Sequence, residues 1–203
     1  MKVKGPLITL GVVAALGVGI LAVNTSKETP SAAPPTAPAT ASSTSAPTTT
    51  TTVPTPFPAK ADYVGKIATA GGVIALDISI SGKKAVAYAC DGKTVETWLT
   101  GPAEAGSVKL TDKDKTSRLE GRHEGKNVTG TLTIGDKSWP FTAAAVQPPA
   151  GLYSEQANGV RNSWIVDADR SVTGVQRAAD GATAPAPAFP RNATRVEGDI
   201  DVL

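Results

Sequence analysis

Two residues carry side chains suited to nucleophilic or acid–base chemistry, and each type occurs once in the chain. Cys90 is the single cysteine and His123 the single histidine of 203 residues. A thiolate activated by an imidazole could act as a nucleophile, but such a pair must meet in the fold and needs an orienting group. We interpret Cys90 as a small buried thiol, because it shares one face of an alternating segment with Val86 and Tyr88. We interpret His123 as a solvated loop residue beside a predicted turn.

A single cysteine excludes an intramolecular disulfide. An intermolecular disulfide and a catalytic nucleophile remain as alternatives for Cys90.

Paired carboxylates occur at Asp112 with Asp114 and at Asp167 with Asp169. A calcium loop that begins at Asp112 would need a glutamate at its twelfth position, where the chain has His123 instead. We therefore interpret both pairs as solvated turns. The sequence predicts no catalytic residues, no metal site and no cofactor.

Trp98 and Tyr88 are the candidate residues for contact with a ligand or partner. If Val95 and Leu99 point into a core, Trp98 points outward and lies beside Tyr88 on the facing strand. Exposed aromatic side chains are typical of recognition surfaces. The alternative is that Trp98 packs beneath a second lobe.

The other two tryptophans, Trp139 and Trp164, alternate with apolar neighbours and are predicted to lie in the core.

The elements that hold these residues show apolar side chains at every second position, which is typical of half-buried antiparallel strands. Asp91-Gly92 predicts a two-residue hairpin, and Pro140 predicts an edge position or a bulge. Short strands with tight turns predict an all-β antiparallel meander, which forms a small up-and-down barrel, complete or incomplete, or a sandwich. The predicted strands cover residues 73–81, 84–90, 93–100, 107–111, 117–122, 127–134 and 138–145.

Shorter strand-like segments follow at residues 152–153, 164–166 and 172–176. We place the β domain at residues 59–179. Residues 180–203 form an Ala/Pro-rich C-terminal tail that either remains free or docks back as a strand.

The N-terminal third has a different composition. Residues 7–23 carry no charge and follow Lys2 and Lys4. As a helix this run would measure about 26 Å, slightly less than the ~30 Å hydrocarbon core of a bilayer. We favour an uncleaved signal anchor, with residues 1–6 in the cytoplasm and the rest of the protein outside. A cleaved signal peptide, and hence secretion, is the alternative.

Residues 24–58 predict a disordered linker, because 30 of the 35 positions are Thr, Pro, Ala or Ser. Such a segment lacks the apolar side chains that would offset the entropy of folding. The order is thus an anchor, a spacer and a head, the last comprising residues 59–203. Of the 20 Lys and Arg residues, all but Lys2, Lys4 and Lys27 lie in the head, where 17 basic and 17 acidic residues cancel. The head therefore carries no excess charge that would favour nucleic acid.

Five short segments of the head carry a resemblance to known proteins. They are Ala87-Tyr88-Ala89-Cys90-Asp91-Gly92, Trp98-Leu99-Thr100-Gly101, Thr129-Gly130-Thr131-Leu132, Trp139-Pro140-Phe141-Thr142-Ala143 and Pro149-Ala150-Gly151-Leu152-Tyr153. With these segments the head resembles uncharacterised exported proteins of actinobacteria. Those proteins are similar in combining an apolar N-terminal segment, a Pro/Thr/Ala-rich spacer and a single β domain. The resemblance implies a location in the cell envelope and carries no activity over to any residue.

From these observations we expect a non-enzymatic protein of the plasma membrane, single-pass through residues 7–23, whose β domain is a binding or assembly module. The expected partner is an envelope protein, a glycan or a lipid. The alternative is an envelope hydrolase or thiol enzyme that uses Cys90 and His123.

Overall fold

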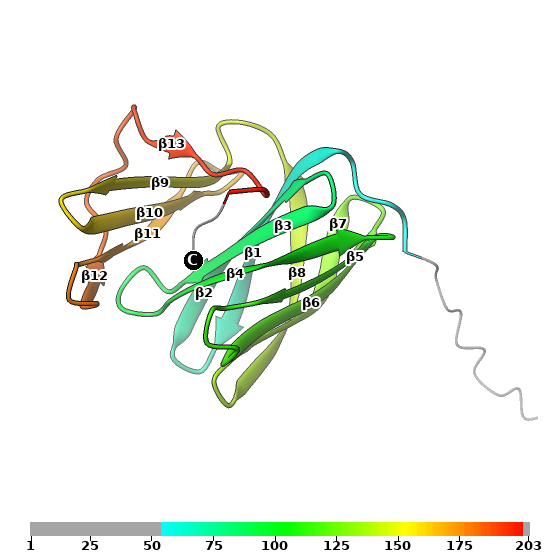
Figure 1. The fold of residues 1–203 in the computed structure, drawn as a ribbon, viewed down its shortest axis with the longest axis horizontal. Helices are drawn as coiled ribbons and strands as arrows, with labels where there is room; N and C mark the ends of the chain where they lie inside the picture. Colours follow the sequence, from blue (N-terminus) through cyan, green and yellow to red (C-terminus); the bar gives the residue numbers. More distant parts are fainter. Residues whose placement is uncertain (1–53, 201–203) are drawn as a thin grey trace, which may run out of the picture. The chain divides into compact units, whose positions relative to one another are not determined.

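The computed structural model describes residues 54–200, which are built of β-strands (Figure 1). The predicted cytoplasmic segment, the signal anchor and the linker up to residue 53 lie outside the described residues, as do residues 201–203. No helix in residues 54–200 has the length and apolarity needed to cross a bilayer.

The first eight strands form a closed antiparallel barrel, so the predicted all-β meander is confirmed. Each strand pairs with the next along the chain, and β8 closes the barrel against β1. The strands are β1 (Lys60–Thr69), β2 (Gly72–Ser81), β3 (Lys84–Cys90), β4 (Glu96–Glu104), β5 (Ser107–Thr111), β6 (Ser117–Glu124), β7 (Asn127–Ile134) and β8 (Lys137–Val146).

The alternation of β2 and β3 determines which side chains fill the barrel. Ile74, Leu76, Ile78 and Ile80 of β2 lie in the interior core, together with the alanines of β3 at every second position. These alanines leave room for larger side chains from the opposite wall, including Leu119, Leu132 and Phe141. The interior is therefore a packed core.

One strand was missed, and one local expectation was wrong. β1 was not predicted, because Gly65 occupies an inward position and interrupts the apolar alternation between Tyr63 and Ile67. The expected two-residue hairpin at Asp91-Gly92 is a longer loop, in which one carboxylate oxygen of Asp91 accepts hydrogen bonds from the backbone amides of the three residues at 93–95. β4 consequently begins at Glu96 and not at residue 93.

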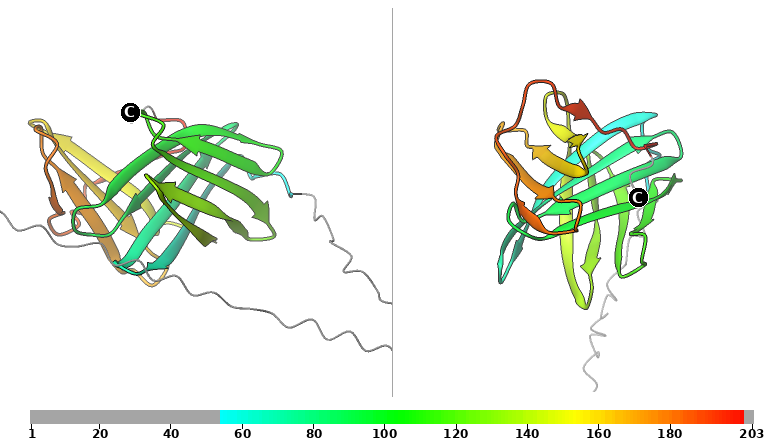
Figure 2. Two further views of the ribbon diagram at one scale, coloured as in Figure 1. Left: turned by 90° about the horizontal axis from the view of Figure 1, so that it is seen from below. Right: turned by 60° about the vertical axis from the view of Figure 1, so that its left-hand side comes forward.

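The remaining strands form a second antiparallel sheet, in the order β12-β11-β10-β9-β13, that covers part of the outer wall of the barrel (Figure 2). Apolar side chains from both layers form a second core, which includes Val86 and Tyr88 of the barrel and Leu152, Ile165 and Val175 of the sheet. The strands are β9 (Gly151–Ala157), β10 (Val160–Val166), β11 (Val172–Arg177), β12 (Thr183–Pro185) and β13 (Thr194–Arg195).

The Ala/Pro-rich C-terminal segment is part of this second layer. β12 pairs with β11, and β13 pairs with β9. Between them, Phe189 packs against Trp164 and Tyr153, and the Trp164 indole donates a hydrogen bond to the carbonyl of Pro187 at 2.9 Å. Residues 186–190 therefore cover the face of the sheet that is turned away from the barrel.

The two ends of the barrel differ. At the end where the chain enters, Thr55 donates its amide to the His123 carbonyl at 3.1 Å, and the Phe57 ring stacks on the His123 imidazole. The folded part of the chain thus begins before residue 59, within the segment assigned to the linker. The hairpin tips of β1–β2, β3–β4, β5–β6 and β7–β8 lie at the other end.

Candidate functional site

The predicted contact residues Trp98 and Tyr88 lie on the outer wall of the barrel, but the second sheet covers them. Trp98 is 4% exposed and Tyr88 is fully buried. Their ring centroids are 4.6 Å apart, and the Arg161 guanidinium lies over the Trp98 ring. Trp98 does point out of the barrel, but it is not exposed: the alternative interpretation, in which Trp98 packs beneath a second lobe, is the one that the structure shows. We assign both aromatic side chains to the interface between the two layers.

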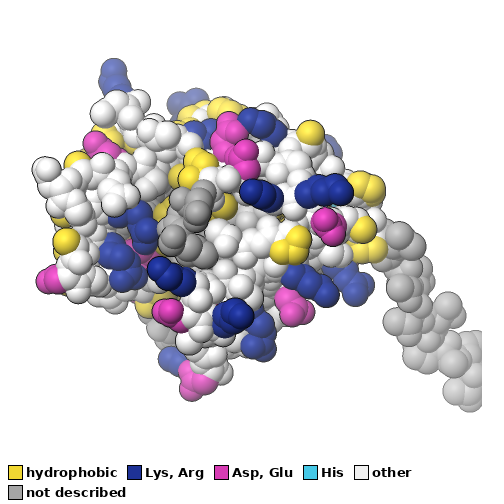
Figure 3. Space-filling view, viewed as in Figure 1, with side chains coloured by type: hydrophobic (Ala, Val, Ile, Leu, Met, Phe, Trp, Pro, Cys, Tyr) yellow, Lys and Arg dark blue, Asp and Glu magenta, His cyan; other side chains and the backbone are white. Residues whose placement is uncertain are grey.

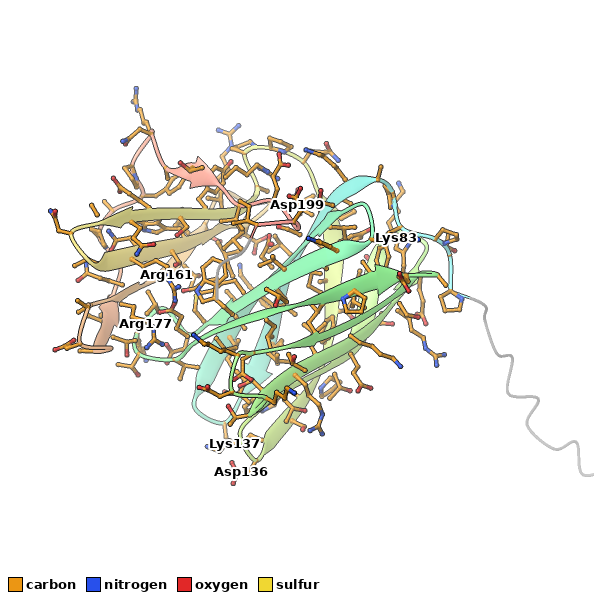
Figure 4. The ribbon with its side chains drawn as sticks, in the orientation of Figure 1. Lys83, Asp136, Lys137, Arg161, Arg177 and Asp199 are labelled. Carbon is orange, nitrogen blue, oxygen red and sulfur yellow. The ribbon has the colours of Figure 1, made fainter. Side chains whose placement is uncertain are left out.

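A buried carboxylate joins the layers beside these rings. Glu96 accepts hydrogen bonds from the Trp98 indole and from Arg161 Nη2, both at 2.8 Å, and forms an ion pair with Arg177 Nε at 3.3 Å. Arg161 and Arg177 are direct cross-strand neighbours on β10 and β11. Figure 4 shows both arginines between the second sheet and the barrel. This cluster holds the second sheet against β4.

Cys90 and His123 are on opposite faces of the barrel wall. Cys90 lies in the outer core beneath the second sheet, and burial raises the pKa of its thiol to about 11. His123 points into the interior and is 5% exposed, so its interpretation as a solvated loop residue was wrong. β6 extends to Glu124 and carries His123 inward by the same alternation as Leu119. The fold therefore does not bring the thiol and the imidazole together.

His123 closes one end of the barrel. Its Nδ1 lies 3.0 Å from the Thr55 carbonyl and 3.1 Å from the Pro56 carbonyl, so we infer that Nδ1 carries the proton. Nε2 then accepts a hydrogen bond from the Tyr63 hydroxyl at 3.1 Å. All polar atoms of the ring are thus used in holding the entering chain against the barrel.

A chain of buried polar groups runs along the outer face of β2. The Ser79 hydroxyl lies 2.8 Å from Asp62 and 2.9 Å from Asp77, and Arg195 Nη2 donates to Asp62 at 2.8 Å. A hydroxyl has one proton to donate. We infer that the Ser79 hydroxyl donates its hydrogen bond to the Arg195-paired Asp62 and accepts one from a protonated Asp77 carboxyl. Burial, reinforced by the negative charge of Asp62, raises the pKa of the Asp77 carboxyl well above its usual range, which favours this neutral form.

The cleft next to this chain, of about 200 Å³, is lined by charged groups that already have partners. Asp62 pairs with Arg195, and Lys60 pairs with Glu197. Among residues 54–200, no group of three or more His, Cys, Asp or Glu side chains is placed to hold a metal ion. We assign these charges to the attachment of the C-terminal segment to β1.

A recess of about 540 Å³ opens at the end of the barrel away from His123. Its volume falls within the range of small-molecule sites, and it exceeds the other described clefts, which measure about 200 to 350 Å³. Figure 4 places Asp136 and Lys137 at the hairpin tip of this end and Lys83 at the opposite end. The apolar lining comes from Val73, Ile74, Val95, Ile134 and Trp139.

Two of the lining side chains are exposed in a way that packing does not explain. Val73 is 52% exposed and Val95 is 37% exposed, whereas Ile134 and Trp139 are half-buried against the interior core. An exposed apolar cluster beside a recess is typical of a binding site. The sequence assigned Trp139 to the core. The feature of the sequence that marked this site was the Gly71-Gly72 turn, which is followed directly by Val73.

Comparison of the chain with protein-family models, with curated proteins and with solved structures found no match. The distribution of charge does not indicate another binding site on the face shown in Figure 3, since basic and acidic side chains are interspersed there. The recess at the open end is therefore our candidate functional site.

Proposed function

We propose that the protein is a non-enzymatic binding module of the cell envelope, which is held on a membrane tether and takes an apolar group of its ligand into the recess at the open end of the barrel. The observation that carries the proposal is the position of the exposed Val73 and Val95 beside a recess of about 540 Å³. The tether belongs to the sequence-based part of the proposal, because residues 7–23 lie outside the described residues.

The position of the recess fits a tethered module. The described chain enters the barrel at the end that His123 and Phe57 close, and the recess is at the other end. A ligand that approaches from outside would meet the recess without passing the linker. The remainder of the interior is filled with side chains, which favours the open end over the centre of the barrel as the binding position.

Binding of the neutral fluorescent probe N-phenyl-1-naphthylamine to the full chain in detergent micelles tests this proposal. We expect Val73→Asp to weaken binding of the probe about ten-fold, because an apolar ligand would have to desolvate the new carboxylate. Val172→Asp is the matched control, since Val172 is 43% exposed on β11 and does not line the recess. Equal binding by the two variants would contradict the proposal.

A further inference from the structure

The recess at the end of the barrel away from His123 is lined by three charged side chains, those of Asp91, Asp136 and Lys137. Asp136 and Lys137 are consecutive residues at the exposed tip of the β7–β8 hairpin, where their opposite charges offset each other (Figure 4). Asp91 belongs to the loop between β3 and β4 and is half-buried. The lining therefore carries one carboxylate whose charge no other lining residue offsets.

The Asp91 carboxylate is held in place by the backbone of its own loop. Its Oδ1 accepts hydrogen bonds from the amides of Lys93, Thr94 and Val95 at 2.8, 2.9 and 2.9 Å. Partial burial would raise the pKa of this carboxyl, but the hydrogen bonds from the backbone amides together outweigh burial and hold the pKa below its ordinary value. Asp91 is therefore ionised at neutral pH, and its Oδ2 takes no part in these three bonds.

The lysines of the neighbouring cleft do not neutralise Asp91. Lys66 and Lys93 line this cleft, which shares Asp91 with the recess. Lys66 Nζ lies 2.7 Å from Asp167 and 3.7 Å from Asp169, so its charge is already paired. Within residues 54–200, no lysine side chain is recorded at ion-pair distance from Asp91. The carboxylate is thus available to a cationic group of a ligand.

The apolar part of the lining also suits an organic cation. The face of an indole ring attracts cations, and Trp139 lines the recess. Val73 and Val95 supply aliphatic surface for the hydrocarbon part of a ligand. Val95 also donates its amide to Asp91, so one hydrogen bond joins the apolar surface to the carboxylate.

Complementarity of charge separates the possible ligands. An anionic group in the recess would be repelled by Asp91 and could pair only with the exposed Lys137. A neutral group would gain nothing from the carboxylate. A cationic group would pair with a carboxylate that is already fixed, so little side-chain entropy would be lost on binding.

We propose that the ligand is a small organic cation, an apolar group that carries a protonated amine, and that the amine pairs with Asp91 Oδ2 while the apolar group packs against Val73 and Trp139. The recess volume of about 540 Å³ falls within the range of small-molecule sites. This inference rests on the proposed function, and it specifies the chemical class of the ligand.

The test compares naphthalene probes of nearly equal size that differ in charge: 1-naphthylmethylammonium, 1-naphthalenemethanol and 1-naphthoate. Isothermal titration calorimetry measures their binding to the full chain in micelles of a non-ionic detergent, with empty micelles as the blank. We expect the ammonium to bind about ten-fold more tightly than the alcohol, because a charge-assisted hydrogen bond adds to the same apolar contact. The naphthoate should bind more weakly than the alcohol.

Asp91→Asn should abolish the preference for the ammonium and leave binding of the alcohol within about two-fold, because the amide oxygen of asparagine can still accept the loop hydrogen bonds. Asp114→Asn is the matched control, since it removes the same charge from the exposed β5–β6 loop and does not line the recess. It should keep the preference. In the wild type, which tests the charge without a substitution, the preference should shrink as the salt concentration rises from about 0.05 M to about 0.5 M.

Equal binding of the ammonium and the alcohol by the wild type would overturn the cationic class, and so would tighter binding of the naphthoate. An equal loss of preference in Asp91→Asn and Asp114→Asn would contradict pairing at Asp91. If Val73→Asp still weakens binding of the neutral naphthylamine probe in any of these cases, the proposed function stands and only the class of ligand is wrong.

Discussion

At the residue scale, Asp77 shows how this domain accommodates a buried acid. The carboxyl lies beneath the second sheet on the outer face of β2, where it faces Ser79, Asp62 and, beyond them, Arg195. An ionised carboxylate would be poorly solvated there and would be repelled by Asp62. A neutral carboxyl can instead donate a hydrogen bond to the Ser79 hydroxyl. Each hydrogen bond from Asp77 through Ser79 to Asp62 then has one donor and one acceptor.

This arrangement predicts a pH dependence of stability. The pKa of Asp77 is raised in the folded state, so between the unfolded value and the folded value the native state binds the extra proton. The free energy of unfolding should therefore fall as the pH rises through that window, with a slope of up to about 1.4 kcal/mol per pH unit for one proton. Asp77→Asn should remove this component, because its neutral amide can donate to Ser79 at any pH.

Urea unfolding of the two proteins between pH 4 and pH 9 measures the difference. Asp136→Asn is the control, since it removes an aspartate from the exposed β7–β8 turn and leaves the Asp77 network intact. Parallel curves for the wild type and Asp77→Asn would show that Asp77 is not the group that holds the proton.

Glycine at inward positions is the other residue-scale feature. Gly121 of β6 and Gly130 of β7 are directly opposite each other. A Cβ at Gly121 would lie 3.2 Å from the Phe141 ring, and a Cβ at Gly130 would lie 2.0 Å from the Glu120 carbonyl oxygen. The missing side chains make room for the Phe141 ring and for the close approach of the two strands.

At the element scale, the segment from β13 to residue 200 acts as a strap across the barrel. Val196 is buried in the outer core and donates its amide to the Leu152 carbonyl at 2.9 Å. A Cβ at Gly198 would lie 2.4 Å from the Ser79 carbonyl oxygen, so the strap rests directly on the backbone of β2. Two ion pairs, Arg195 with Asp62 and Lys60 with Glu197, join the strap to β1.

These two ion pairs should contribute unequally. The side chains of Arg195 and Asp62 are 23% and 19% exposed, whereas those of Lys60 and Glu197 are 68% and 46% exposed. We expect Arg195→Ala to lower the free energy of unfolding by about 1 to 2 kcal/mol, because Asp62 keeps its charge without its partner. Lys60→Ala, the control on the same strap, should leave the free energy of unfolding nearly unchanged, because solvent screens this exposed ion pair.

Urea denaturation at pH 7 checks this prediction. If both variants lost the same free energy, the strap would be held by its backbone contacts and by Val196, and not by the partly buried ion pair.

At the scale of the whole molecule, the two ends of the barrel differ: His123 and Phe57 close one end, and the recess lies at the other. The described chain enters the barrel at the end closed by His123, and Lys137 lies at the other end. If residues 7–23 anchor the chain, the open end is exposed outside the cell. Cys90 is buried with a raised pKa, so it provides little background for labelling with thiol reagents.

We expect a membrane-impermeant maleimide to label Lys137→Cys on intact cells and to leave Lys4→Cys unlabelled, because Lys4 belongs to the predicted cytoplasmic segment. Immunoblotting of the membrane fraction with a mass-tagged maleimide measures the labelled fraction. Recovery of Lys137→Cys protein in the medium would indicate a cleaved signal peptide instead. Protection of both cysteines until the cells are lysed would contradict the extracytoplasmic location.

Much of the barrel could be predicted because its strands are determined locally. In β2 and β7 the apolar residues recur at every second position, and the bounds of β3, β5 and β7 agree with the predicted ranges. β1 could not be recognised, since the reason for Gly65 is the passage of β8, a strand about eighty positions later. Pro140, which predicted an edge or a bulge, pairs with Thr131 of β7 and lies outside the three-pair ladder between β8 and β1.

The candidate site depended on contacts between distant segments. Alternation correctly placed Trp98 on the outer face of the barrel, but only the fold shows that β10 and its Arg161 cover that face. Trp139 follows the core pattern of its strand, and only the fold shows that it lines a recess together with the β1–β2 turn and Val95. A periodicity of two identifies the face of a side chain, but it cannot tell which other element lies against that face.

The amino-acid sequence by itself determined the all-β architecture and the meander, because alternation, turn residues and composition act between neighbours in the chain. The tertiary structure alone decided which faces are covered, at which end of the barrel the recess lies and that Cys90 and His123 are separated. Those outcomes depend on the packing of β1 with β8 and of the second sheet with the barrel, which join residues far apart in the chain.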